Sequence, residues 1–181
     1  IGLTTLNNSS SHYGLSLILG GAEGTLWDVT SGYTRMARSL SGLTEDDYPR
    51  ILSSLDSSGK SEQSKTYQPK SSSLRPNLFQ PGAVWQTFDA IKEVNRPEEI
   101  DWRIIPSMQT VAWKTGTSYG LRDAWAVGVT ARFVVGVWVG NATGEGKPGL
   151  IGARTAGPVM FDIFNMLPSS KWFDVPYSEF I

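Results

Sequence analysis

A lysine, two threonines and a glycine stand side by side in the second half of the chain, in an order that suits recognition of a carboxylate. Lys114, Thr115, Gly116 and Thr117 directly follow the apolar residues 111–113, a pattern that predicts a strand. An ammonium group can hold a carboxylate or lower the pKa of a neighbouring hydroxyl. Because side chains alternate along a strand, both threonine hydroxyls would lie on one face and could bind the same carboxylate.

The glycine in this segment favours a peptide ligand. Gly116 has no side chain, so the backbone of a peptide can lie against the strand edge. Such a peptide would leave the Thr117 N–H directed at an oxyanion that develops on a carbonyl under attack. The candidate catalytic residues are therefore Lys114 and Thr117, and the candidate substrate-binding residues are Thr115, Gly116, Thr117 and Ser118. Four residues of this kind are common on strands, so the motif needs support from its surroundings.

Composition excludes several classes of function. The 181 residues carry a net charge of -1, so no electrostatic argument favours nucleic acid or an anionic membrane as a partner. The absence of cysteine excludes disulfides, thiolate metal sites and cysteine nucleophiles. The single histidine, His12, lies in a polar stretch typical of a surface loop, and one imidazole makes a zinc site or a Ser-His-Asp triad improbable. We therefore expect neither a metal nor a cofactor.

Hydrophobic periodicity predicts three helices and three strands. The first helix begins at Thr25, which forms an N-cap pair with Asp28. Pro81 opens the second helix, whose apolar face reaches Val94, and Pro158 opens the third. Runs rich in Val, Trp and Phe, separated by short polar turns, predict strands at residues 110–117, 124–130 and 133–140.

The order of these elements predicts an α+β fold, in which an antiparallel sheet is flanked by helices. The turns between the strands are too short for parallel pairing. Gly128 and Gly136 lie inside predicted strands, which indicates that another element approaches closely at both points. Residues 41–77 differ from the rest, because they are rich in Ser, Lys and Asp and contain several prolines. This composition predicts a long surface excursion.

Four segments agree, in order, with one protein family. They are residues 13–23 (YGLSLILGGAE), residues 113–128 with WKTGTSYG and then RDAWAVG, residues 137–141 (VWVGN) and residues 155–158 (TAGP). Together they resemble the transpeptidase domain of bifunctional, class A penicillin-binding proteins, nearest to the 1C type of that family. The resemblance covers most of residues 13–168 except the excursion. It implies an incomplete domain of the fold shared by penicillin-binding protein transpeptidases and serine β-lactamases, with K-T-G as their third motif.

The resemblance implies a peptidoglycan D,D-transpeptidase, which crosslinks the cell wall by serine acyl transfer. A serine in an S-x-x-K motif attacks a stem peptide that ends in D-Ala-D-Ala, and β-lactam antibiotics acylate the same serine. By resemblance, Lys114 lies beside the S-x-N motif, the Thr115 and Thr117 hydroxyls hold the carboxylate, and the Thr117 N–H supplies half of the oxyanion hole. The parent protein would be membrane-anchored and extracytoplasmic, on the periplasmic side of the inner membrane. No apolar run in this chain reaches the roughly 18 residues of a membrane span.

The nucleophile that this chemistry requires is not identifiable in the chain. Residues 57–60 match S-x-x-K, but they lie in a polar run and follow residues 13–36, whereas the family's nucleophile precedes that passage. The sequence contains no Ser-x-Asn. We therefore expect residues 1–181 to be the C-terminal portion of a transpeptidase domain, inactive by itself, whose partner is the missing N-terminal half. The face toward that half would then be exposed and prone to self-association.

Two other functions stay open. A serine β-lactamase or β-lactam-sensor domain shares the fold and the motif, but no deacylating base can be identified, and the long strand pair favours the transpeptidase. A non-enzymatic carbohydrate- or partner-binding module would need exposed aromatic rings. Trp113, Trp125 and Trp138 lie within predicted strands, a position more typical of a core.

Overall fold

The computed structural model describes residues 3–41, 79–94, 96 and 109–180. The predicted excursion at residues 41–77, apart from Ser41, and the S-x-x-K match at residues 57–60 lie outside the described residues. Within the described ranges, no helix has the length and apolar character needed to cross a membrane.

Three antiparallel strands form the sheet at the centre of the molecule, in the order β1-β2-β3. β1 spans Ala112–Thr117, β2 spans Asp123–Val129 and β3 spans Val134–Gly140. Each strand lies within two residues of its predicted bounds, because the β-branched and aromatic runs coincide with the pleated, half-buried surface that they favour. In the register of β1 and β2, Thr117 lies opposite Ala124.

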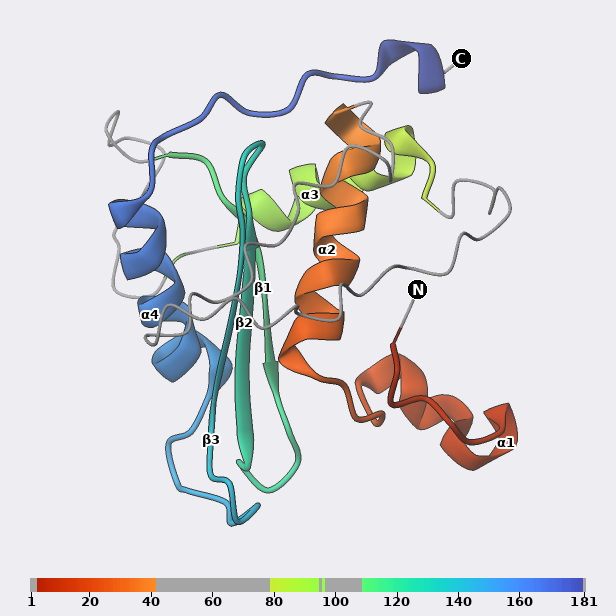
Figure 1. Ribbon diagram of the computed structural model, residues 1–181, viewed down its shortest axis with the longest axis vertical. Coiled ribbons are helices and arrows are strands. Elements are labelled where there is room, and N and C mark those ends of the chain that lie inside the picture. The colour runs from red at the N-terminus through yellow and green to blue at the C-terminus, as the bar shows by residue number, and fades with distance from the viewer. Residues whose placement is uncertain (1–2, 42–78, 95, 97–108, 181) are drawn as a thin grey trace, which may run out of the picture.

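Helices cover both faces of this sheet. α2 (Leu26–Ser41) and α3 (Pro81–Lys92) lie on one face and α4 (Gly152–Met166) lies on the other, so that the sheet is seen edge-on between them (Figure 1). The predicted α+β fold with an antiparallel sheet flanked by helices is confirmed. The core under α4 includes Val111, Trp113, Ala126, Met160 and Phe164. The core under α2 and α3 includes Ala37, Val84, Phe88, Ala112 and Val129.

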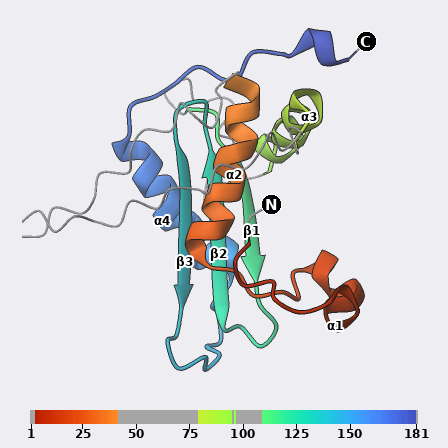
Figure 2. The ribbon, with the colours of Figure 1, turned by 45° about the vertical axis from the view of Figure 1, so that its right-hand side comes forward.

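Both ends of the described chain pass outside these layers. The N-terminal segment contains the short helices α1 (Ser10–Tyr13) and η1 (Gly14–Leu19) and projects sideways from the start of α2 (Figures 1 and 2). The C-terminal segment leaves α4, crosses the end of the sheet and reaches α3, where η4 (Tyr177–Glu179) lies. Phe173 enters the core under α2 and α3, so this segment links the two helical layers.

Two glycines allow the helices to approach the sheet closely, as their positions inside strands predicted. A Cβ atom on Gly128 would lie 2.5 Å from the Phe164 ring and 2.8 Å from the Met160 sulfur of α4. A Cβ atom on Gly136 would lie 2.0 Å from the Thr30 hydroxyl oxygen of α2. These separations are shorter than any normal contact, so a larger residue at either position would push a helix away from the sheet.

The start of α4 differs from the prediction. The helix begins at Gly152, and Pro158, which was expected to open it, stands inside. Gly152, Ala156 and Gly157 are buried against the sheet in the first half of the helix. This tertiary packing outweighs the local preference of proline for a helix start.

The end of α3 also differs from the prediction. The helix ends at Lys92, so Val94 lies beyond it and is exposed rather than part of its apolar face. The Val94 carbonyl instead accepts a hydrogen bond from Trp113 Nε1 at 3.2 Å. A contact with a strand residue, which local periodicity cannot show, therefore fixes this stretch of chain.

A buried carboxylate holds the N-terminal segment to α2. Asp28 Oδ2 accepts hydrogen bonds from the Thr4 hydroxyl at 2.6 Å and from the Thr4 N–H at 3.0 Å. The Asp28 N–H donates to Thr25 Oγ1 at 3.0 Å, which confirms Thr25 as the helix cap. The two hydrogen bonds from Thr4, the hydroxyl first, lower the pKa of Asp28 below its ordinary value.

Replacing Asp28 with asparagine is expected to loosen the segment around Thr4. Because the pKa is lower in the folded state, the Asp28 carboxylate stabilises this contact above its unfolded pKa, near 3.8, and the stabilisation is lost as pH falls through the folded value. The protection factor of the Thr4 amide, measured by hydrogen exchange, should fall about tenfold in Asp28→Asn at neutral pH. Asp162→Asn, at an exposed position of α4, is the control. Equal protection in Asp28→Asn and the wild type would contradict this account.

Candidate active site on strand β1

The segment from Lys114 to Thr117 occupies an edge strand. β1 pairs with β2, and no other described strand pairs with its opposite edge. Just past the end of β1, the Ser118 N–H donates to Asp123 O at 2.9 Å, so these two residues form a hydrogen-bonded pair. Since bonded and non-bonded pairs alternate in an antiparallel ladder, the N–H and C=O groups of Thr115 and Thr117 point away from β2. A peptide along this open edge would meet donors and acceptors spaced for strand pairing.

The Lys114 ammonium reaches the same edge. Its Nζ donates a hydrogen bond to Thr115 O at 2.6 Å, and the side chain is exposed. Strand alternation places Lys114 and Gly116 on the face of α2 and α3, whereas Trp113, Thr115 and Thr117 lie on the face of α4. A ligand at this edge would therefore be contacted by the lysine from one face and by the threonines from the other.

The Thr117 hydroxyl is oriented by α4. The N–H of Gly152, the first residue of α4, donates to Thr117 Oγ1 at 2.9 Å. The hydroxyl thus accepts a hydrogen bond from the backbone and keeps its own hydrogen for donation. Gly152 is absent from the residues predicted from sequence, because the helix was expected to begin at Pro158. The small residues Gly152, Ala156 and Gly157, at helical spacing, were the available sign of a closely packed helix.

Ser118 belongs to the turn between β1 and β2. Its Oγ accepts a hydrogen bond from the Asp123 N–H at 2.8 Å. Gly120 and Leu121 in this turn have φ angles of 80° and 55°, which makes it a tight turn. Ser118 therefore has a structural role beside the candidate site, and its expected contact with a substrate stays a prediction.

The three tryptophans of the sheet differ in burial. Trp113 is 2% exposed and its ring centroid lies 5.1 Å from that of Phe161. Trp125 is half-buried. Trp138 is 38% exposed and donates its indole N–H to Asp123 Oδ1 at 2.9 Å. A core position is confirmed for Trp113 and wrong for Trp138, and Trp113 offers no exposed ring to a sugar.

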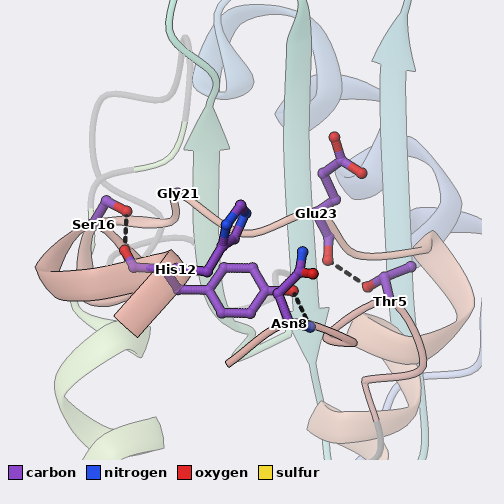
Figure 3. A pocket seen from close by; sticks show the side chains of 7 residues that line it. Thr5, Asn8, His12, Ser16, Gly21 and Glu23 are labelled. Atoms are coloured by element: carbon purple, nitrogen blue, oxygen red, sulfur yellow. Dashed lines mark hydrogen bonds between the residues drawn. The ribbon is translucent and has the colours of Figure 1, made fainter. Parts of the chain in front are cut away.

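A polar pocket of approximately 220 Å³ lies within the N-terminal segment (Figure 3). Its polar groups are partly paired with one another, since Ser16 donates to Tyr13 O at 2.5 Å and the Asn8 N–H donates to Tyr13 Oη at 3.3 Å. His12 is exposed, as predicted, although it lies in a short helix rather than a loop. The lining residues are Thr5, Asn8, His12, Tyr13, Ser16, Gly21 and Glu23. None of them belongs to β1, so this pocket is not part of the site at the strand edge.

Comparison with known proteins agrees with this architecture. The chain is 36% identical over 155 residues to penicillin-binding protein 1C of Escherichia coli (strain K12). The match covers 86% of this chain and 17% of that protein, so the chain spans about a sixth of the length of this relative. No family model and no solved structure matches the chain. The similarity extends over most of the chain, in agreement with the order of the sequence motifs and with the fold. The chain is therefore a penicillin-binding protein 1C-like region.

Proposed function

We propose that the chain forms one wall of a peptidoglycan D,D-transpeptidase site, the wall that recognises the substrate. The observation that carries the proposal is the open edge of β1, where Lys114 Nζ donates to Thr115 O and the Thr117 hydroxyl accepts from the Gly152 N–H. The similarity to penicillin-binding protein 1C supports it. Because the chain spans only 17% of that protein, the activity of the whole protein is part of the proposal.

In the proposed reaction, a stem peptide lies along β1 with its terminal carboxylate near Thr115 and Thr117. A serine from outside these 181 residues attacks the carbonyl of the penultimate D-Ala, and the developing oxyanion accepts a hydrogen bond from the Thr117 N–H. The Lys114 ammonium stabilises the negative charge that forms near the attacking oxygen. The C–N bond then breaks, and the departing D-Ala amine takes up the proton lost by the serine. The acyl group stays on the serine until an amine of a neighbouring peptidoglycan strand accepts it.

The same wall suits β-lactam antibiotics. Their carboxylate would occupy the place of the stem-peptide carboxylate beside Thr115 and Thr117, and their ring carbonyl would face the Thr117 N–H. After ring opening, the amine stays tethered to the acyl group and cannot diffuse away. The antibiotic would therefore acylate the serine and block the site.

The proposal also concerns the parent protein and its location. Residues 1–181 would form the C-terminal portion of a transpeptidase domain in a membrane-anchored protein, on the periplasmic side of the inner membrane. Leu15, Ile18 and Leu19 are 84%, 83% and 89% exposed. Such exposed aliphatic side chains support the proposal that the N-terminal half of the domain covers this surface. The chain would then self-associate when that half is absent.

Incubation with a fluorescent penicillin tests the proposal. The isolated 181-residue chain is expected to form no covalent adduct, whereas a longer polypeptide that includes the natural upstream segment should be labelled. Labelling of the isolated chain would show that the nucleophile lies within it, and Ser57 would be the first residue to examine. No labelling of either polypeptide would contradict the proposed function. Rapid release of hydrolysed label would favour a β-lactamase.

A further inference from the structure

We propose that Gly152 is a positioning residue of the β1 site. Its N–H orients the Thr117 hydroxyl toward the carboxylate of the ligand, and its lack of a side chain allows α4 to come close enough for this contact. The inference rests on the proposed function of the site and adds to it a residue that lies 35 positions from Thr117 in the sequence.

The hydrogen bonds at the start of α4 show why the Gly152 N–H donates to a residue of the strand. The first N–H groups of a helix have no partner within the helix. Ile151, at the N-cap position, has no side-chain acceptor to offer. Its carbonyl accepts from the N–H groups of Arg154 and Thr155, each at 2.9 Å. The Gly152 N–H instead donates to Thr117 Oγ1 at 2.9 Å, so a strand residue acts as the helix cap.

This contact fixes the direction in which Thr117 can donate. A threonine hydroxyl has one hydrogen to donate and lone pairs that accept. Because Gly152 donates to the oxygen, the hydroxyl hydrogen must point elsewhere, and Thr117 is exposed at the open edge of β1. An ionised carboxylate only accepts hydrogen bonds, so it matches this arrangement. The partial positive charge at the start of α4 acts in the same direction.

The packing of Gly152 explains why a glycine is required there. A Cβ atom at this position would lie 2.5 Å from Gly116 O and 2.6 Å from Trp125 O. It would also lie 3.1 Å from Thr115 Cβ. Both oxygens are backbone atoms of the β1–β2 pair and cannot move aside without disturbing the sheet. A side chain at position 152 would therefore lift the first turn of α4 and lengthen the hydrogen bond to Thr117.

Gly152→Ala in the full-length protein tests the inference. The second-order rate constant for acylation should fall about tenfold or more with a fluorescent penicillin that has a free carboxylate, and little with its methyl ester. The control is Gly136→Ala, which places the same methyl group on the opposite face of the sheet, against Thr30 of α2 and away from α4. The control should lower the melting temperature and leave the ratio of the two rate constants unchanged.

Variants of Thr117 keep the inference testable if Gly152→Ala does not fold. In Thr117→Val the Gly152 amide loses its acceptor, and its hydrogen-exchange protection should fall about tenfold. Thr117→Ser should retain both the protection and the preference for the carboxylate. If Gly152→Ala folds, adding it to Thr117→Val should cause no further loss of acylation.

The outcomes separate this inference from the proposed function. Equal losses for the acid and the ester, fully additive effects in the double variant, or unchanged protection in Thr117→Val would each overturn the role of Gly152 while leaving the proposed function intact. If the wild-type protein is not acylated at all, the proposed function fails and the inference fails with it.

Discussion

Replacing Lys114 with alanine in the full-length protein is expected to slow acylation by penicillin about a hundredfold or more. The Lys114 Nζ lies at the open edge of β1, hydrogen-bonded to Thr115 O at 2.6 Å, where the carbonyl under attack would be bound. The side chain is exposed and belongs to neither core. The acylation rate should therefore fall without a comparable loss of stability. Fluorescence of the labelled protein measures the rate, and thermal melting measures the stability.

Two variants test whether position and geometry matter as well as charge. Lys171→Ala removes an exposed lysine from the C-terminal segment and should leave the acylation rate unchanged. Lys114→Arg keeps the charge but replaces a compact ammonium with a planar guanidinium, so it should restore only part of the rate. Acylation of Lys114→Ala at the wild-type rate would remove the lysine from the proposed mechanism.

Replacing Trp113 with alanine is expected to lower the free energy of unfolding of the chain by about 3–5 kcal/mol. Trp113 is 2% exposed, and its ring centroid lies 5.1 Å from that of Phe161. Its indole N–H donates a hydrogen bond to Val94 O at 3.2 Å. The alanine variant therefore leaves a cavity under α4 and a carbonyl without its donor. Chemical denaturation followed by circular dichroism measures the change.

A second tryptophan provides the comparison. Trp27 on α2 is 64% exposed, so Trp27→Ala should cost about 1 kcal/mol or less. If the two variants lose similar stability, Trp113 would not be the anchor between β1 and α4 that its burial indicates. A loss confined to Trp113→Ala would show that the residue before Lys114 holds the strand in place.

Most of the fold could be predicted because its determinants are local. Strands β1 to β3 coincide with runs of β-branched and aromatic residues, and short polar turns between them leave only antiparallel pairing. The helix starts at Thr25 and Pro81 could be predicted from residue type. Thr25 accepts a hydrogen bond from an N–H of the first turn, and Pro81 stands at a position where the N–H that proline lacks would have no partner. The start of α4 was not marked in this way, because contacts of Gly152 with the sheet decide it.

The sequence by itself determined which residues could recognise a carboxylate. Lys114, Thr115 and Thr117 are identified by residue type and order, and the alternation of a strand is enough to place the two threonines on one face. Tertiary structure alone decided which partner orients Thr117. The bond from Gly152 to Thr117 joins a helix start to a strand end, and it depends on how closely α4 packs on the sheet, which no local pattern encodes. The same holds for Trp113 and Trp138, whose burial depends on the helix that covers each face.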